Sequence, residues 1–399
     1  MRIAGIIAEY DPFHKGHAAH IAATRAENGG KATHIVTVIS GNFTQRGEPA
    51  LLSKFQRAEM ALANGADLVL ELPIPWAMAP AESFAAGGVA VLNALGCVDC
   101  LSFGSECGDI KTLRQLADLP QRPDYQTTLR QILATGVPYA VAGQTAAAAL
   151  TNEETASHLS TPNNTLGIEY IRAATLQNAH FDYFTLQRQG ALHNENTPNQ
   201  GFASASLLRE WVRKGEADTA AAFMPAEAAS ILRKTLVDDQ AAVHTNVLES
   251  ALLAHLRRMR EEEFLDLPWL SEGIENRLYR TSRTATDYTA LLTDTKTRRY
   301  PMARLRRVLW SALLGIRATD CAGLPPYIRV LGMNTRGREI LNAASPTIPL
   351  FTRTAQMKEL NERCNRIFAL ECTATDLHAL CMGRPAPCGS DHTHKIIVK

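Results

Sequence analysis

The sequence lacks several features that would place it in a class at once. It has no run of 18 or more apolar residues, so no membrane-spanning helix is predicted. Glu9 and Asp11 interrupt the apolar stretch near the start, where an export signal would need an unbroken apolar core. The formal net charge is only +1, so binding to nucleic acid would have to come from a local basic patch. We expect a cytoplasmic protein.

The eight cysteines lack an organising pattern. In a long chain without an export signal, we expect them to be reduced thiols. Cys97 and Cys100 have the C-x-x-C spacing of some zinc sites, but neither a histidine nor a second cysteine pair follows at the spacing of a zinc finger. The segment around them is more typical of the start of a strand. We expect no protein-bound structural metal.

What the sequence does contain is an alternation of strands and helices in its first half. Apolar, β-branched runs are followed by helical stretches that end at glycine. Short connections between such elements favour a parallel sheet with helices on both faces. We predict an α/β fold with a Rossmann-like, doubly wound parallel sheet, whose expected strands cover residues 3–8, 34–40, 67–72, 98–103 and 180–186 and whose expected helices include residues 51–64 and 82–95.

The first strand leads into the most informative stretch. The proline at position 12 ends the strand, and a helix is predicted to begin near Gly16. His14 and His17 would then lie at a helix N-terminus, an end that favours anions, and imidazole donors there would hold phosphate oxygens. Either histidine alone could be a simple capping group. The pair in His-x-Gly-His, directly after a first strand, resembles the HIGH signature of the nucleotidyltransferase α/β-phosphodiesterase superfamily, in which these histidines steady the phosphates of ATP.

Ligands of such sheets bind outside the carboxyl ends of the strands, so the loops that follow them carry further candidates. Gly104 would let a nucleotide approach the backbone, although a plain turn glycine has the same spacing. Asn163 could cap the next helix or bind a ligand, and capping is the simpler interpretation. Arg188 ends a strand, where a guanidinium would meet phosphate. Ser204 is explained by an N-cap, or with Arg209 by a second phosphate clamp.

The ordered set of motifs resembles the bacterial tRNA(Met) cytidine acetate ligase family from position 2 to about 341. The stretches that carry the resemblance are GIIAEYDPFHKGH, ISGNFTQRGEPALLSKFQRAEMAL, ELP, SFGSE, PNNTLGIEYIRA, SASLLRE, RRYPMARLRRVL and PPYIRVLGMNTRGREIL. The resemblance implies ATP as a substrate, with Mg2+ accompanying it, and acetate and elongator tRNA(Met) as the other substrates. It also implies that ATP is bound by Ile7, Ala8, Glu9, Tyr10, Asp11, Pro12, Phe13, His14, Lys15, Gly16, His17, Ala18, Ala19, His20, Gly104, Asn163 and Arg188, with His14 and His17 as the catalytic pair.

One position inside the first motif departs from the family. The family usually has asparagine where this chain has Asp11, which puts a carboxylate near the expected triphosphate. The carboxylate could accept a hydrogen bond within the turn, help to hold a magnesium ion, or weaken ATP binding by repulsion. The residues alone leave these alternatives open.

The second half of the chain is different in character. A helical insertion is expected at about residues 109–160, and beyond Arg209 helical patterns dominate while no comparable strand pattern returns. We expect a catalytic domain at residues 1–209 and a mainly helical domain at 210–399. Within the latter, residues 296–307 carry six basic side chains and no acidic ones. Arg304 and Arg307 would share a helix face that is either merely solvated or binds RNA phosphates, with Tyr300 able to stack on a base.

The resemblance implies a two-step reaction. Acetate attacks the α-phosphorus of ATP to give acetyl-adenylate, and the wobble cytidine of the tRNA then takes the acetyl group. Two other classes stay open: a nucleotidyltransferase that acts on a small acceptor, and a non-catalytic RNA-binding protein on the same scaffold. The first would hardly need a large helical domain, and the second should have lost its histidines. The oligomeric state is not indicated.

Overall fold

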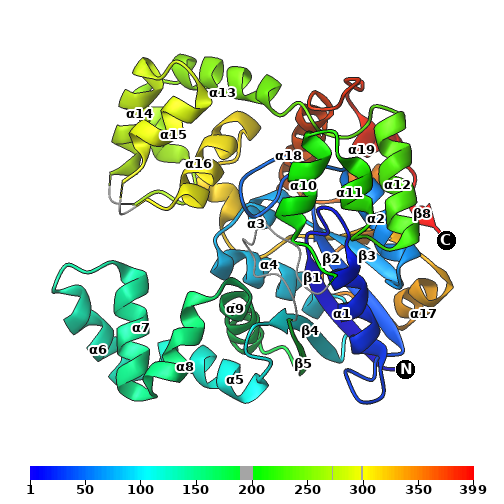
Figure 1. Ribbon diagram of the computed structural model, residues 1–399, viewed down its shortest axis with the longest axis horizontal. Coiled ribbons are helices and arrows are strands. Elements are labelled where there is room, and N and C mark those ends of the chain that lie inside the picture. Colours follow the sequence, from blue (N-terminus) through cyan, green and yellow to red (C-terminus); the bar gives the residue numbers. More distant parts are fainter. Residues whose placement is uncertain (189–200, 272, 298–299) are drawn as a thin grey trace.

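A mixed sheet forms the centre of the molecule (Figure 1). The computed structural model describes residues 1–188, 201–271, 273–297 and 300–399, and within these ranges eight strands form the sheet in the order β5-β4-β1-β2-β3-β6-β7, with β8 paired to β6. Strands β1 to β5 pair in parallel, whereas β6 runs antiparallel to β3. The strands are β1 Ile3–Ala8, β2 His34–Ser40, β3 Leu68–Leu72, β4 Cys100–Ser105, β5 Asp182–Gln187, β6 Ile328–Met333, β7 Leu350–Phe351 and β8 Ile397–Val398.

Helices cover both faces of this sheet, as predicted for a doubly wound fold. Side chains alternate along each strand, so Ile3 and Ile7 of β1 enter one core while Ala4 and Ile6 enter the other. Helices α4 (Ala81–Ala94) and α9 (Pro162–Leu176) pack on the first face, and α1 (Lys15–Arg25) and α2 (Lys54–Ala63) pack on the second. The parallel strands are buried on both faces, which is why their sequences read as continuous apolar runs.

Two helical groups extend away from the sheet on the left of Figure 1. The expected insertion forms α5 (Ile110–Asp118), α6 (Pro123–Leu133), α7 (Tyr139–Leu150) and α8 (Glu153–Ser157). A second bundle has its own core and contains α13 (Asn246–Arg258), α14 (Ile274–Thr284), α15 (Tyr288–Thr295) and α16 (Met302–Leu314). The remaining helices are α3 (Ile74–Ala77), α10 (Ala205–Arg213), α11 (Ala217–Ala221), α12 (Ala226–Val237), α17 (Thr335–Ala343), α18 (Glu362–Ala379) and α19 (Ser390–Thr393), and short 3₁₀ turns lie at Leu119–Gln121, His158–Ser160, Glu261–Asp266, Ala318–Cys321 and Thr354–Glu359.

The C-terminal half corrects one expectation. We predicted no strand beyond Arg209, yet β6 returns to the central sheet and pairs Val330 with Leu70 of β3. The strand is buried along its whole length. A local sequence pattern does not indicate a pairing partner so distant in the sequence. The division near residue 209 stays a prediction, but the sheet itself includes residues from both sides of it. Within the described ranges, no helix is both long and apolar enough to cross a bilayer.

Candidate active site

The turn between β1 and α1 is built around His14 and His17. His14 is the N-cap of α1 and its Nδ1 accepts a hydrogen bond from the Gly16 N–H at 3.1 Å. His17 occupies the third helical position, and its Nδ1 accepts from the His14 N–H at 3.2 Å. Together they form a capping box in which both polar partners are imidazoles. A Cβ at position 16 would lie 2.9 Å from the His14 ring, so glycine lets that ring fold over the turn.

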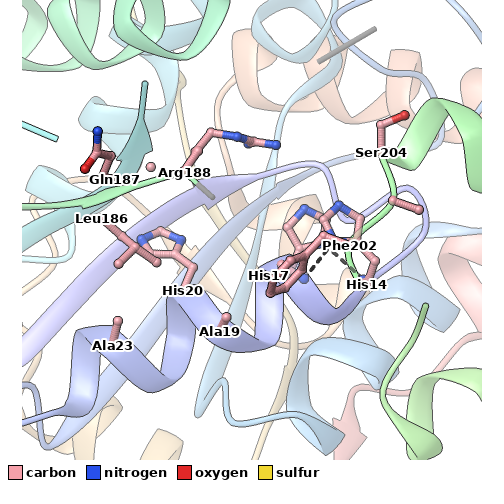
Figure 2. Close-up of a pocket in the computed structure, with 13 residues that line it drawn as sticks. His14, His17, Ala19, His20, Ala23, Leu186, Gln187, Arg188, Phe202 and Ser204 are labelled. Atoms are coloured by element: carbon pink, nitrogen blue, oxygen red, sulfur yellow. Dashed lines mark hydrogen bonds between the residues drawn. The ribbon is translucent and has the colours of Figure 1, made fainter. Parts of the chain in front are cut away.

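This capping arrangement fixes the tautomer of both histidines. A ring nitrogen that accepts a backbone N–H carries no proton of its own, so in each neutral imidazole the proton is on Nε2. The two rings stack with their centroids 3.7 Å apart. Both side chains therefore present an Nε2–H donor in the same region, as Figure 2 shows for the pair at the start of α1.

The histidines are neutral because burial and nearby cations disfavour the charged form. Burial, followed by the charges of Arg188 and Arg209, lowers the pKa of His14 to about 3. Burial and the His14 ring lower the pKa of His17 well below its usual value. Burial and Arg188 lower the pKa of His20 to about 4, and its Nε2 lies 2.9 Å from the Ser102 hydroxyl. At neutral pH these rings act as hydrogen-bond donors and not as cations.

The backbone at this helix end corrects part of the sequence interpretation. We expected exposed N–H groups there to hold an anion. Instead, the Gly16 N–H is used by His14, and the Lys15 N–H donates to the Phe223 carbonyl at 3.0 Å. The Lys15 ammonium also turns away, donating to the Ala222 carbonyl at 2.7 Å. An anion in this cleft would therefore meet the imidazoles first, and the helix dipole only indirectly.

A chain of three polar side chains forms the opposite wall. Glu106, just after β4, accepts from the backbone N–H of Asn163 at 3.1 Å and of Asn164 at 2.7 Å, which caps α9. The Asn163 amide donates to the same carboxylate at 2.6 Å, and its oxygen accepts from Arg188 at 3.2 Å. Asn163 thus holds Arg188 and is not the helix cap that we preferred. A Cβ at Gly104 beside them would touch the Arg188 side chain at 3.4 Å, an ordinary van der Waals contact, so the structure would tolerate a small side chain there.

The hydrogen-bond and ion-pair partners of Asp11 decide among the alternatives that the sequence left open for this residue. Asp11 is 3% exposed, and its Oδ1 accepts from the Leu51 N–H at 2.8 Å. Arg209 pairs with its Oδ2 at 3.5 Å and donates to its backbone carbonyl. The carboxylate therefore bonds within the turn and is neutralised by a cation. Arg209 is consequently committed to Asp11, while Ser204 acts as the N-cap of α10 and accepts from the Leu207 N–H at 3.2 Å.

These walls enclose a cleft with two connected parts. The helix cavity, of about 260 Å³, lies along α1 and is bounded by Ala19, Ala23, Leu186 and Phe202. The loop cavity, of about 310 Å³, lies against the loops that follow β1 and β2 and against α4, α9 and α16. Both share His14, His17, His20, Gly104, Arg188 and Ser204, which form the junction between them. In Figure 2, Arg188 extends from the end of β5 above the histidines of α1.

Most of the predicted site residues border this cleft. Thirteen of them line one cavity or both: Ile7, Ala8, Glu9, Tyr10, Asp11, His14, Gly16, His17, Ala19, His20, Gly104, Asn163 and Arg188. Four others, Pro12, Phe13, Lys15 and Ala18, belong to the motif but not to the cavity walls. The sequence missed Gln45, Arg46, Phe84, Phe103 and Tyr170, which also line the loop cavity, and it nominated Arg307 for RNA contact but not for this cleft. That the lining residues bind ATP stays a prediction.

The basic segment differs from the expected RNA-binding face. Tyr300 is only 6% exposed, so its ring is not available to stack on an RNA base. Arg304 donates to the Trp269 carbonyl at 2.9 Å, and Arg306 pairs with Glu48. Arg307 donates to the Gln45 carbonyl at 3.2 Å and lines the loop cavity. Arg298 and Arg299 lie outside the described residues. The described arginines of α16 therefore face the protein and the cleft.

The residues that the structure describes contain no group of three or more side chains suited to hold a metal ion. Asp11, which could have held magnesium, is engaged as described above. That Mg2+ accompanies ATP stays a prediction. Cys97 is partly buried and Cys100 is buried, and both are free thiols.

Comparison with known proteins places this geometry in context. The sequence model of the HIGH Nucleotidyl Transferase family matches residues 1–391. The tRNA(Met) cytidine acetate ligase of Acetivibrio thermocellus is 35% identical over 416 residues, covering 100% of both chains, and that of Syntrophotalea carbinolica is 38% identical over 90% of this chain and 86% of its own. The crystal structure of apo Thermotoga maritima TmcAL superposes with a TM-score of 0.94 at 30% identity, covering 100% of this chain and 99% of the other. The same protein bound with alpha-thio ATP gives a TM-score of 0.92.

Proposed function

Because the chain belongs to the HIGH nucleotidyl transferase family and, within it, to the tRNA(Met) cytidine acetate ligases, we propose that it acetylates the wobble cytidine of elongator tRNA(Met). The substrates are acetate and ATP, and the products are N4-acetylcytidine, AMP and diphosphate. A tRNA substrate would place this work in the cytoplasm. The observation that carries the proposal is the pair of Nε2–H donors of His14 and His17 at the junction of the two cavities.

In the first step, an acetate oxygen attacks the α-phosphorus of ATP and the bond to diphosphate breaks. Acetate is ionised at neutral pH, so this step needs no base. It needs alignment of two anions and stabilisation of the charge that develops on the phosphate oxygens. Neutral imidazoles supply donors for that charge without attracting a competing counterion, and Arg188 adds a full positive charge. Mg2+ bound with ATP would neutralise further charge on the phosphates.

The two parts of the cleft suit different parts of the substrates. The helix cavity has apolar walls and Gly104 at its edge, which suits the flat base and sugar of a nucleotide. The α-phosphate then lies at the junction, against His14, His17 and Arg188. Acetyl-adenylate formed there has its reactive carbonyl at the entrance to the loop cavity. The exocyclic amine of cytidine attacks that carbonyl, and AMP leaves.

The decisive experiment follows labelled acetate. We expect the purified protein, with ATP and Mg2+, to transfer label to elongator tRNA(Met) and not to initiator tRNA(Met). Acetyl-CoA without ATP is the control for a different acyl donor. If acetate drives exchange of diphosphate into ATP but no tRNA is labelled, the adenylate step stands and the acceptor is wrong. If neither reaction occurs, the proposal fails and a binding protein on this scaffold is the better account.

A further inference from the structure

The loop cavity is larger, and has more aromatic and ionisable side chains in its walls, than the binding of acetate requires. Its volume of about 310 Å³ lies within the range of small-molecule sites, and its inner walls are the buried aromatic side chains of Phe84, Phe103 and Tyr170. A polar side chain, Glu9, stands at the end of β1 in the same cavity and is absent from the walls of the helix cavity. The other acidic residue of this cavity, Asp11, is engaged by Leu51 and Arg209. Flat aromatic walls beside the carboxylate of Glu9 suit a heterocyclic base better than a small aliphatic acid.

We propose that the loop cavity receives the cytosine base of the acceptor tRNA, turned out of its stack, and that Glu9 is the catalytic base that removes a proton from its exocyclic amine. This inference rests on the proposed function, because it assigns the second substrate of that reaction to a place in the cleft. An enzyme that modifies a base atom must draw the base out of the stacked strand and into a pocket, where aromatic walls replace the lost stacking.

The two carboxylate oxygens of Glu9 have different surroundings. Its Oε1 accepts a hydrogen bond from the Gln45 N–H at 2.7 Å, which fixes the orientation of the group. Among the residues that the structure describes, none donates a hydrogen bond to Oε2 or forms an ion pair with Glu9. One oxygen is therefore held by the protein while the other is left for a ligand of the loop cavity.

The charges around Glu9 suit a group that gains and loses a proton. Burial, together with the negative charge of Asp11, raises the pKa of the Glu9 carboxyl above its usual value, while the Gln45 N–H and the cations Arg209 and Arg46 oppose this rise. Burial, with a smaller contribution from the charge of Glu9, raises the pKa of Tyr170, so its phenol stays protonated. A carboxylate with a raised pKa is a stronger base than one in water.

The proton balance of the second step shows what Glu9 would do. The amine nitrogen of cytidine forms a bond to the acetyl carbon, and the bond from that carbon to the AMP oxygen breaks. The nitrogen must lose one proton, because the product is a neutral amide. Glu9 accepts this proton and later releases it to solvent, so AMP departs as an anion. No oxidant, metal or additional substrate is required.

Arg307 supports a polynucleotide as the ligand of this cavity. Its Nη1 donates to the Gln45 carbonyl, and within the described ranges its buried Nε has no hydrogen-bond partner. Gln45 also donates its N–H to Glu9, so the cation and the carboxylate are attached to one loop residue. A guanidinium beside the base pocket is suited to the phosphate that accompanies each nucleotide.

The test separates the two half-reactions with the Glu9→Gln variant. Glutamine retains an oxygen that can accept the Gln45 N–H, so the loop should keep its shape. Glu9 lies in the stretch that is expected to bind ATP, so acetate-dependent exchange of diphosphate into ATP, and trapping of the acetyl group by hydroxylamine, are measured at saturating ATP and serve as the reference for the second step. Transfer to tRNA in a single turnover should fall on the order of 10²- to 10⁴-fold, the usual contribution of a catalytic base. The affinity for tRNA should be unchanged.

A pH profile and a matched variant complete the test. In the wild type, single-turnover transfer should rise with pH through the acid range and then level off, as the Glu9 carboxyl loses its proton; in Glu9→Gln this rise should be absent. Glu48→Gln is the control, because that carboxylate lies in the same region but pairs with Arg306 outside the cavity. If Glu9→Gln slows exchange and transfer equally, or leaves transfer intact, the inference is wrong. If the wild type shows no exchange with acetate, the failure lies in the proposed function instead.

Discussion

Two groups of polar side chains, one open to a cavity and one fully buried, make an instructive comparison. In the cleft, His14, His17 and Arg188 present donors to an open cavity. Near the end of β3, five side chains form a closed ionic cluster, defined here as Lys54, Glu71, Arg329, Glu371 and Asp391. Each side chain of this cluster is at most 5% exposed. Both groups lie at the same end of the sheet, but only in the second do the charged side chains pair with one another.

The ionic cluster balances its own charges. Lys54 lies 2.6 Å from Glu71 and 2.7 Å from Asp391, and Arg329 contacts the same two carboxylates. Burial and the neighbouring Glu71 raise the pKa of Glu371 well above its usual value, which favours the protonated form of this third acid. With Glu371 protonated, two cations face two anions. In the cleft, Arg188 forms no direct ion pair with a described residue, and it reaches the carboxylate of Glu106 only through Asn163. This arrangement favours a substrate that supplies negative charge.

The largest effect is expected from removing both histidines. The His14→Ala, His17→Ala double variant should lose roughly 10³-fold or more of acetate-dependent diphosphate exchange, because two donors to the developing phosphate charge disappear. Loss of the capping box should cost only about 1 kcal/mol of unfolding free energy, and tRNA binding should persist. His34→Ala is the control, since His34, like His14, is 7% exposed but pairs with Glu339 outside the cleft. Unchanged exchange in the double variant would remove the histidines from the mechanism.

The closed cluster should show the opposite response. Lys54→Met leaves Glu71 and Asp391 with one cation fewer in a buried site, so we expect a loss of about 3–5 kcal/mol of unfolding free energy in urea. Exchange activity per folded molecule should change little. Lys214→Met provides the contrast, because Lys214 pairs with Glu210 at 2.6 Å while 58% exposed, and should leave the unfolding free energy nearly unchanged. Equal effects of the two variants would show that the cluster is not a stabilising unit.

A fall in pH should lower the free energy of unfolding, because histidines of the folded protein resist protonation. The folded pKa values of His14, His20 and His378 lie at about 3, 4 and 4, chiefly because of burial, whereas an unfolded histidine titrates near 6.5. Below about pH 6.5 the unfolded state binds more protons, so stability is lost as the pH falls towards 4, by up to about 1.4 kcal/mol per pH unit for each histidine.

The His378→Gln variant tests this pH dependence. Glutamine can keep a donor for the Ala50 carbonyl, which His378 contacts at 2.8 Å. Urea unfolding at several pH values should show a shallower slope for this variant between pH 4 and 6.5 than for the wild type. An identical slope would mean that His378 is not held neutral in the folded protein.

The smallest effects should come from α16, and they distinguish its two neighbouring arginines. Arg306→Ala removes a partly exposed pair with Glu48 and should change unfolding free energy by about 1 kcal/mol or less, without altering transfer to tRNA. Arg307→Ala should leave stability similar but weaken the use of tRNA several-fold, seen as a higher KM, because Arg307 lines the loop cavity. If both variants behave alike, the cavity does not distinguish the two arginines.

The sequence predicted the parallel part of the sheet closely. Strands β1 and β2 begin and end where the apolar runs do, at Ile3–Ala8 and His34–Ser40, because a strand buried on both faces leaves a local and continuous signal. Strand β6 was missed because its position depends on pairing with β3, more than 250 residues earlier, which leaves no local trace.

The site was predictable where one motif contains it and not where distant elements meet. The histidine pair and its glycine lie within four residues, so their arrangement could be inferred from spacing. The cap of α9 could not, because Glu106 comes from the loop after β4 and not from the chain that precedes the helix. Likewise, Arg307 borders the cleft only through its contact with Gln45, and its basic neighbours suggested a solvent-exposed RNA-binding face instead.

The ionic cluster also determines when, during synthesis, the fold around β3 can be completed. Lys54 and Glu71 leave the ribosome early, but Arg329 and Asp391 follow more than 250 residues later. At a synthesis rate of about 5–20 residues per second this delay is on the order of tens of seconds, during which the edge of β3 lacks both its strand partner and its counter-charges. A nascent chain arrested before residue 329 should therefore stay sensitive to protease around β3, and the full chain should become resistant only after release.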